Sequence, residues 1–378
     1  MGKKQTDNVV PRQQKREDKY YYASQWTLMR RKFRKHKLAM AATWLLAIFY
    51  LCAIFGNFLS PQGTEQYEGK YVNCGPTKVH LFHEGKFVGP FVYGLEVERD
   101  PETMMKNFVE DKSQIYRLKF FTQGSEGGEY KFLGLFESNL HLFEAEEGGR
   151  VFLFGTDSMG RDLFSRVILG SQISLSIPLV GAVLTLVLGL LMGSLAGYIG
   201  GWVDTVIQRI IEVVRSFPQV PLWMALSAAI PKTMKPAQVF MLMTLILSLI
   251  SWPDLARTVR SKFISVKKED FIMAARISGA PAHKIVTRHM IPSFLSYIIV
   301  NLTLSIPGQI IGETTLSFLG LGLRSPATSW GVLLQETNKL ETILFYPWRL
   351  IPMIFVFLSV LAFNFLGDGL RDAADPYK

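Results

Sequence analysis

The sequence is poor in the side chains from which metal and redox sites are usually built. It has 378 residues, of which 2 are cysteine and 6 are histidine. Cys52 lies inside a long apolar run and Cys74 lies outside it, so we expect neither an intramolecular disulfide nor a cysteine metal site. The following histidines show no ligand spacing: His80, His83, His141, His283 and His289.

Motifs of common enzyme classes are also missing. The sequence has no GxxxxGK[ST] phosphate loop, no HExxH and no GxSxG, so we expect no catalytic residue, cofactor site or metal site in this chain. A charged cluster of Asp157, Arg161 and Asp162 precedes a long apolar run. Its position favours a role in starting a helix and forming an interface over a role in catalysis.

What the sequence has in abundance is long apolar runs, with 49% hydrophobic residues. About 20 such residues cross the ~30 Å hydrocarbon core as a helix. The first run is an anchor and not a cleaved signal peptide, because its N-terminal region is too long and no small-residue cleavage site follows. We expect an all-α membrane protein with six transmembrane helices at Leu38–Leu59, Ser174–Tyr198, Val203–Ile230, Pro236–Leu255, Ile291–Glu313 and Phe345–Leu366.

The net charge of +10 is explained by topology better than by nucleic-acid binding. Residues 1–37 hold 12 Lys and Arg against 3 Asp and Glu, and residues 257–290 hold 8 against 2. Residues 60–165 hold 11 against 17. Because cytoplasmic loops collect Lys and Arg, we expect both termini and the 257–290 loop in the cytoplasm, residues 60–165 outside, and lipid around the spans.

Five parts follow from these patterns. They are a basic cytoplasmic tail and interfacial helix at 1–37, a first span at 38–59, a β-rich periplasmic insertion at 60–165, a five-helix core at 166–369 containing a cytoplasmic segment at 267–283, and a cytoplasmic tail at 370–378. Residues 25–37 form a basic, partly amphipathic run that suits the inner membrane face. A plain solvated tail is the alternative.

Within the insertion, apolar and polar residues alternate on both sides of Glu84-Gly85, which predicts a β-hairpin. Two further strand-like segments flank the glycine-rich residues 124–129 and predict a second hairpin. Aromatic side chains are numerous here, and we expect them to form the core of the insertion: Phe82, Phe87, Phe91, Tyr93, Phe120 and Phe121.

The second span carries Gly189, Gly193 and Gly197 at intervals of four residues. Small residues at this spacing let helices approach closely in lipid, so these glycines predict tight helix packing. Later, residues 312–336 are apolar but broken by glycine, which suggests a re-entrant or interfacial element with a short surface helix from Trp330 through Glu336.

Ionisable residues in the spans are gate or pathway candidates, because charge at membrane depth faces water or the protein interior. The candidates are Asp204, Arg209, Glu212, Arg215 and Glu313. The first four can also pair on one helix surface, since Arg209–Glu212 and Glu212–Arg215 are three residues apart. We favour such a packing cluster over a gate. Pro218 and Pro221 predict a kink or break after it.

The segment Lys267–Pro292 is a polar, basic island between two apolar spans. Glu269 and Asp270 suit a helix N-terminus, Gly279 a helix end and Pro281 the start of a second short helix. Side chains at helical spacing fall on one side, namely Phe271, Ala274, Ala275 and Ser278. A compact helix-turn-helix of this kind is typical of a membrane subunit that docks onto a partner.

This segment is similar to the EAA coupling motif of ABC-type importer permeases. The family has Glu-Ala-Ala, three residues and Gly; here Met273 stands at the Glu position, followed by Ala274, Ala275 and Gly279, and His289 and Pro292 match later positions. Residues 155–177, 313–336 and 364–377 resemble the dipeptide/oligopeptide/nickel branch and its C-type subunit.

The resemblance implies a type I importer permease in the bacterial inner membrane. It implies half of a translocation pathway for di- or oligopeptides, working by alternating access. The implied partners are a homologous second permease, two ATPases that bind ATP and Mg, and a periplasmic or lipid-anchored substrate-binding protein. The implied ATPase-coupling residues are Asp270, Met273, Ala274, Ala275, Gly279, His289 and Pro292, with Ala275 and Gly279 allowing close docking.

Other functions remain open at this point. Nickel and oligosaccharide importers share the same hallmarks. A secondary transporter working alone would need internal repeats with ion sites, and no convincing repeat is present. A membrane-anchored receptor that uses the insertion would not need six spans.

Overall fold

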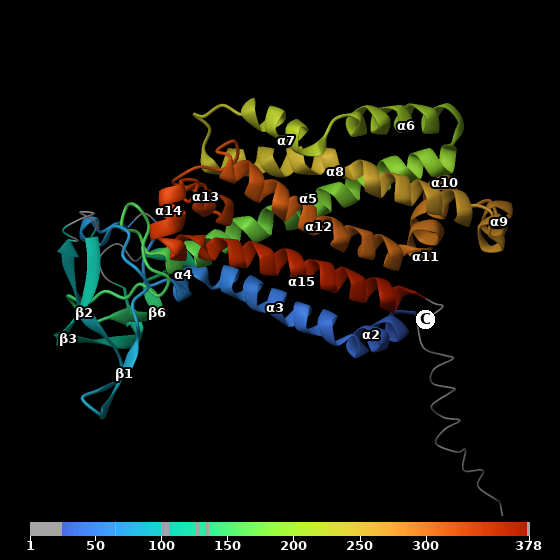
Figure 1. The fold of residues 1–378 in the computed structure, drawn as a ribbon. Helices are drawn as coiled ribbons and strands as arrows, with labels where there is room; N and C mark the ends of the chain where they lie inside the picture. Colours follow the sequence, from blue (N-terminus) through green and yellow to red (C-terminus); the bar gives the residue numbers. More distant parts are fainter. Residues whose placement is uncertain are drawn as a thin grey trace, which may run out of the picture.

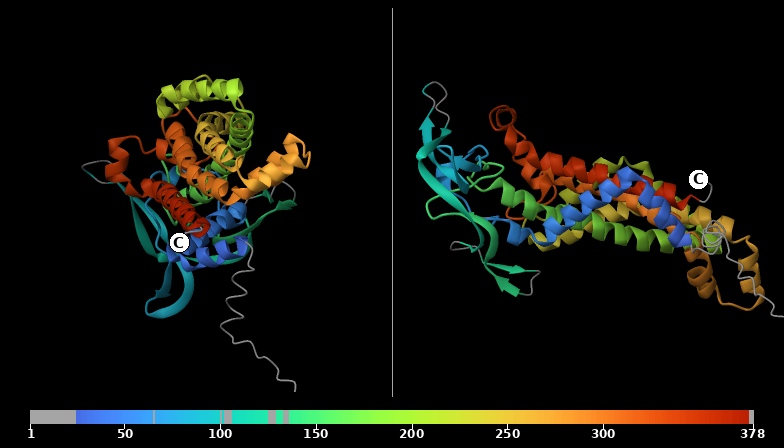
Figure 2. Two further views of the ribbon diagram at one scale, coloured as in Figure 1. Left: turned by 90° about the vertical axis from the view of Figure 1, so that its right-hand side faces the viewer. Right: turned by 90° about the horizontal axis from the view of Figure 1, so that it is seen from below.

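The computed structural model describes residues 25–64, 66–99, 101, 106–124, 129–132 and 136–375. Helices form a long bundle with a β-rich unit at one end and α9 (Asp270–Ile277) at the other (Figure 1, Figure 2). We call these two ends the sheet end and the α9 end. The basic tail expected at residues 1–24 and the last three residues of the expected C-terminal tail lie outside the described residues.

Among the described residues, five helices are long and apolar enough to cross a membrane. Four are α3 (Lys37–Ile54), α5 (Leu163–Ile199), α8 (Pro236–Val266) and α12 (Leu295–Phe318), and the fifth joins η3 (Pro347–Leu350) to α15 (Ile351–Ala374). At about 1.5 Å per residue, a helix as long as α5 extends beyond the ~30 Å hydrocarbon core. The helical membrane fold with a β-rich insertion is confirmed.

The predicted third span is not one helix. It consists of α6 (Gly201–Ser216) and α7 (Gln219–Ala228), which lie end to end along α8 (Figure 1). Phe217 between them is extended, with φ −92° and ψ 139°. Pro218 explains the break, because a proline ring disfavours helical geometry at the residue before it.

The helices pack through apolar side chains that are far apart in the sequence. Ala42 and Leu46 of α3 meet Ile306 and Ile310 of α12 and Phe363 of α15 in one buried cluster. The opposite faces of α3 and α5 expose a row of apolar side chains, including Trp44, Ile48, Val187 and Leu191. Such rows suit lipid or another membrane subunit.

The basic run at the start of the described chain is helical. It forms α2 (Gln25–Lys35), which lies beside the C-terminal part of α15 at the α9 end (Figure 1). Met29 is buried, and Lys32 Nζ donates to the backbone oxygen of Asp375 at 2.8 Å. α2 therefore ties the start of the bundle to its end.

The insertion contains an antiparallel sheet in the order β1 (His80–His83), β2 (Lys86–Arg99), β3 (Lys106–Gln123), β6 (Leu140–Ala145). The predicted turn at Glu84-Gly85 is present, with φ of 47° and 78°. The predicted hairpin over residues 124–129 is wrong, because β3 pairs with β2 and then with β6. The strand after the glycine-rich stretch, β4 (Tyr130–Phe132), pairs with β5 (Phe136–Ser138).

The aromatic core predicted for the insertion is also largely wrong. Phe91 is buried, but Phe82, Phe87, Phe120 and Phe121 are each more than half exposed. The core combines side chains of β2 and β6 with side chains from segments before and after the sheet. Its buried members are Tyr71, Cys74, Phe152, Val92, Phe143 and Val151.

Short elements complete the fold. They are α4 (Gly56–Leu59), η1 (Gly69–Tyr71), α10 (Ala282–Lys284), η2 (Ile285–Met290), α11 (Ile291–Ser293), α13 (Trp330–Gln335) and α14 (Leu340–Phe345). The short helix expected from Trp330 is α13, but its surface position is wrong. Trp330 is fully buried and its indole N–H donates to the backbone oxygen of Val167 at 3.0 Å, because α13 folds back against α5.

Candidate functional site

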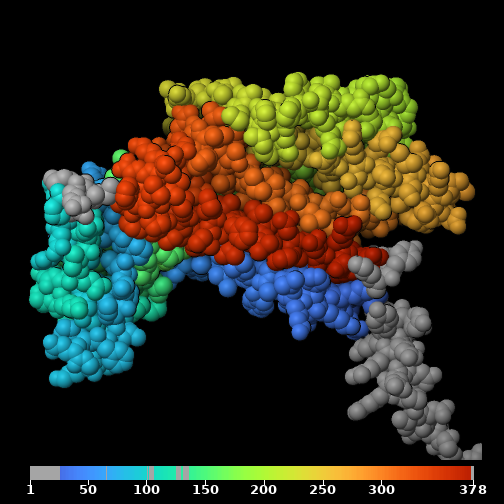
Figure 3. All heavy atoms as spheres, in the orientation of Figure 1, coloured from blue at the N-terminus to red at the C-terminus, as the bar shows by residue number. Residues whose placement is uncertain are grey.

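The segment with the clearest functional geometry is α9 together with the chain that follows it. It forms the tip of the molecule at the α9 end (Figures 1 and 3). Ile272 is fully buried, whereas Phe271, Met273 and Ile277 are exposed, Ile277 to 85%. A short helix at the end of a membrane bundle therefore presents apolar side chains outward, as a docking surface does.

A well-formed turn ends α9. Gly279 has a φ of 76°. Its backbone N–H donates to the backbone oxygen of Arg276, and the N–H of Ala280 donates to the backbone oxygen of Ala275 at 3.1 Å. These two hydrogen bonds, together with a glycine in the left-handed conformation, form the Schellman motif. A side chain at Gly279 would strain this conformation. The predicted helix end at Gly279 is confirmed as a structural feature.

The inner face of α9 is seated firmly on the bundle. Ile272 and Ile285 pack in one buried cluster with Val259 and Phe263 of α8 and Ile298 of α12. Ala275 packs against the same cluster. A displacement of α9 would therefore be transmitted to both α8 and α12.

The predicted coupling residues thus divide into two groups. Asp270, Met273, Ala274 and Gly279 are exposed on α9 and its turn, as are His289 in η2 and Pro292 in α11. Ala275 differs, because it faces the protein's own core and not the outer surface. Phe271, Ala274 and Ser278 are exposed on the outward side of α9. The side of the helix predicted from the sequence is therefore correct for these three residues but not for Ala275.

The three glycines of α5 lie against α8. A Cβ atom at Gly189 would lie 2.8 Å from Leu255, at Gly193 2.6 Å from the backbone oxygen of Ala256, and at Gly197 2.5 Å from Phe263. These separations are shorter than van der Waals contact, so the close approach of α5 and α8 depends on glycine at these positions.

The charged residues of α6 do not form one cluster. Arg209 pairs with Glu212 at 2.6 Å, as its spacing predicts. The predicted Glu212–Arg215 pair is wrong, because Arg215 binds Asp254 of α8 at 2.8 Å. Asp204 also reaches α8, where Arg260 donates two hydrogen bonds of 2.5 Å to its carboxylate.

Glu313 lies in the interior of the bundle. Its side chain is completely buried in α12, and it accepts hydrogen bonds from Ser317 at 2.9 Å and from Ser174 of α5 at 3.4 Å. The carboxylate thus joins two membrane helices. A pathway role for Glu313 stays a prediction.

A buried ion network at the sheet end was missed in part by sequence reasoning. Asp157 accepts from Arg161 Nε at 2.7 Å and from Arg166, and both arginines also reach Glu336 after α13. Arg349 of η3 also belongs to this network, because its guanidinium group pairs with the carboxylate of Glu336 at 3.4 Å. The sequence pattern FGTDSMGRD indicated the charged residues Asp157 and Arg161. No local pattern links these residues to Glu336 and Arg349, which are distant in the chain.

The start of α5 shows the predicted helix-start role directly. Asp162 precedes α5, and its carboxyl group accepts from the backbone N–H and the hydroxyl of Ser165 at 2.8 and 2.6 Å. Burial raises the pKa of Asp162 to about 6, against the opposing effect of these hydrogen bonds. For Asp157, burial alone would raise the pKa, but Arg166, Arg161 and backbone N–H groups together lower it.

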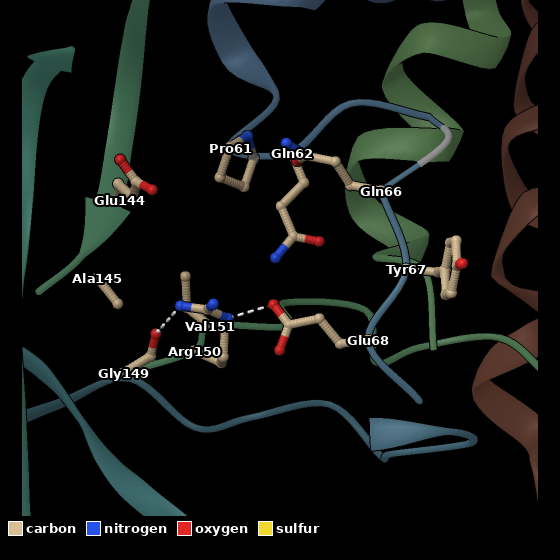
Figure 4. A pocket seen from close by; sticks show the side chains of 10 residues that line it. All are labelled: Pro61, Gln62, Gln66, Tyr67, Glu68, Glu144, Ala145, Gly149, Arg150 and Val151. Atoms are coloured by element: carbon tan, nitrogen blue, oxygen red, sulfur yellow. Dashed lines mark hydrogen bonds and ion pairs between the residues drawn. The ribbon is translucent and has the colours of Figure 1, made fainter. Parts of the chain in front are cut away.

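A polar pocket of ≈ 450 Å³ lies within the insertion at the sheet end, between the chain that follows α4 and the segment at the end of β6 and after it (Figure 4). Glu68 and Arg150 line it and form an ion pair, and Arg150 also donates to the backbone oxygen of Gly149 at 2.9 Å. The ion pair ties the segment after β6 to the loop before η1.

The chain is similar to permease proteins of peptide transport systems. Residues 186–377 match the model of the family described as binding-protein-dependent transport system inner membrane component, and residues 24–76 match the N-terminal TM domain of oligopeptide transport permease C. The oligopeptide transport system permease protein OppC of Salmonella typhimurium is 43% identical over 225 residues, covering 59% of this chain and 72% of the relative.

The dipeptide transport system permease protein DppC of Lactococcus lactis is 31% identical over 347 residues, covering 92% of this chain and 89% of the relative. Such coverage must include most of the insertion. The oligopeptide permease OppC of Bacillus subtilis is 34% identical over 224 residues, covering 59% of this chain and 71% of the relative. The chain belongs to the family of binding-protein-dependent transport system inner membrane components.

Proposed function

We propose that this chain is the C-type permease subunit of an ATP-driven importer of di- or oligopeptides. The observation that carries the proposal is α9, whose inner side is anchored on α8 and α12 and whose outer side exposes Phe271, Met273 and Ile277. The names of the relatives, which are oligopeptide and dipeptide permeases, support peptides as the solute.

The mechanism follows from this arrangement. An ATPase beneath the membrane binds ATP and Mg, and its closure moves α9. Because α9 is packed on α8 and α12, and α8 is packed closely on α5, the motion tilts these helices together. Alternating access results when this half rocks against a homologous second permease. ATP hydrolysis belongs to the partner, so this chain is not itself an enzyme.

The proposed topology puts the α9 end, both termini and α2 in the cytoplasm of a bacterium. The sheet end then faces the outside, where a periplasmic or lipid-anchored binding protein delivers the peptide. Lys and Arg enrichment of residues 257–290 supports this orientation. The insertion lies where it could contact the binding protein or the second permease.

Native mass spectrometry of the complex purified through a tag on this chain tests the proposal. We expect one copy of this chain, one homologous permease and two ATPases, with peptide masses on any binding protein retained. A chain that purifies alone or only with copies of itself would contradict the proposal and favour a stand-alone transporter. Nickel or an oligosaccharide on the binding protein would contradict the peptide assignment.

A further inference from the structure

A polar crevice of ≈ 220 Å³ opens among the membrane helices α5, α8 and α12 and the shorter helix α7. Its lining combines one carboxylate with side-chain amides and hydroxyls, contributed by Gln219, Ser251, Asp254, Thr258, Asn301 and Ser305. Elsewhere the helices pack mainly through apolar clusters, with few polar contacts such as the one between Ser174 and Glu313. Polar side chains at membrane depth are costly unless they face water or polar partners.

Asp254 is the charged member of this crevice. It lies within α8, its side chain is 69% exposed, and it pairs with Arg215 of α6, which is 45% exposed, at 2.8 Å. An exposed carboxylate within a membrane helix cannot face hydrocarbon without a large cost. Asp254 therefore faces water or a polar partner in the assembled protein.

Local structure opens the crevice on both sides. The break at Phe217–Pro218 starts α7 at Gln219, which brings its amide to the crevice. On α12, Asn301, Ser305 and Gly308 share one helix face. A Cβ atom at Gly308 would meet nothing within 4 Å, so space remains beside this face.

We propose that this crevice lines the translocation pathway and that Asp254 binds the N-terminal ammonium group of the passing peptide. The inference rests on the proposed function. The hydroxyls of Ser251 and Ser305 donate to backbone oxygens of their own helices and so offer acceptors, whereas the amide of Gln219 offers both a donor and an acceptor. These groups match the peptide backbone and not any particular side chain. The ammonium group competes with Arg215 for the carboxylate through a charge-assisted hydrogen bond.

Cysteine accessibility tests whether the crevice contains water. In the complete complex, with Cys52 and Cys74 replaced by alanine, Asp254→Cys is compared with Leu245→Cys. Leu245 is 42% exposed on the same helix, and its separation of nine positions from Asp254, about two and a half turns, puts it on the opposite face. A charged, membrane-impermeant thiol reagent should modify Asp254→Cys at least ~10-fold faster, and transported peptide should slow that reaction.

Uptake of a peptide with a free N-terminus by the reconstituted complex tests the role of the charge. Asp254→Asn should lower uptake about 10-fold, and Asp254→Glu should retain most of it. Equal modification of both cysteines, or wild-type uptake by Asp254→Asn, would overturn the inference. Failure of the wild-type complex to import any peptide would instead contradict the proposed function. Copurification of the partner subunits with each variant shows that the complex is intact.

Discussion

At the scale of single residues, the most demanding arrangement is the ion network at the sheet end. Asp157 and Arg166 are both almost completely buried, and Glu336 and Arg349 complete the network from distant parts of the chain. Burying charge costs several kcal/mol per ion unless it is paired and hydrogen-bonded. The network therefore holds together the start of α5, the end of α13 and η3, provided that each member is present.

Replacing Arg166 tests this dependence. Arg166→Met leaves the buried carboxylate of Asp157 with one guanidinium partner fewer, so we expect a loss of about 3–5 kcal/mol in the free energy of unfolding. Arg209→Met removes an exposed pair and should cost about 1 kcal/mol or less. The midpoint of thermal unfolding in detergent compares the two variants, and an equal decrease would contradict the importance of the network.

Asp162 should make stability depend on pH. Its pKa is about 6 in the folded chain and about 4 when unfolded, so the folded state binds an extra proton between these values. The free energy of unfolding therefore falls as the pH rises from about 4 to 6, by on the order of 3 kcal/mol, and stays lowered above pH 6.

Asp162→Asn keeps a helix-capping side chain but removes the ionisable group. Its thermal midpoint should exceed that of the wild type at pH 7.5, and the difference should shrink at pH 5. Thermal unfolding measured at both pH values checks this. A difference that does not change with pH would show that Asp162 is ionised in the folded protein.

At this scale the sequence allowed part of the site to be predicted. Asp157, Arg161 and Asp162 were expected to start a helix, because local spacing and an adjacent apolar run carry that information. Arg166, Glu336 and Arg349 were missed, since their pairing depends on α13 and η3 returning to α5. The same return buries Trp330, which was expected at the surface.

At the scale of elements, the contact of α5 with α8 connects α9 to the rest of the bundle. Gly193 has the backbone of α8 directly in front of it, whereas Gly308 of α12 has open space. We therefore expect a glycine-to-alanine substitution to lower stability at Gly193 but not at Gly308.

Gly193→Ala should destabilise the protein by about 1–3 kcal/mol, because the added methyl forces α5 and α8 apart. Gly308→Ala should be neutral or stabilising by up to about 1 kcal/mol, because alanine is the better helix former. Thermal midpoints of the two variants provide the measurement. A neutral Gly193→Ala would contradict close packing of α5 on α8.

For α9, substitutions at the neighbouring residues Ala274 and Ala275 distinguish an effect on docking from an effect on folding. Ala274 is exposed, so Ala274→Trp should leave the thermal midpoint nearly unchanged but lower uptake about 10-fold or more by blocking the ATPase contact. Ala275 packs on the core, so Ala275→Trp should lower the midpoint itself. Normal uptake by Ala274→Trp would show that this side of α9 does not contact the ATPase.

Elements were predicted best where the signal is local. The long apolar runs, the break at Pro218, the turn at Glu84-Gly85 and the helix end at Gly279 all follow from neighbouring residues. The hairpin over residues 124–129 failed, because the long strand β3 finds a partner in β6 beyond the local glycines.

At the scale of the whole molecule, the chain has two structurally different ends joined by close-packed helices. The α9 end exposes an apolar helix on a rigid base, and the sheet end holds a β-rich unit and a buried ion network. The broken pair α6–α7 and the crevice beside Asp254 lie between them. This arrangement supports a subunit that transmits motion from one side of a membrane to a solute pathway.

The central claim is tested most directly by uptake of a labelled peptide into liposomes that contain the complete purified complex. We predict uptake that requires ATP on the α9 side and the binding protein on the sheet side, and that is lost when this chain is omitted. Uptake by this chain alone, without ATP or partner subunits, would contradict the account.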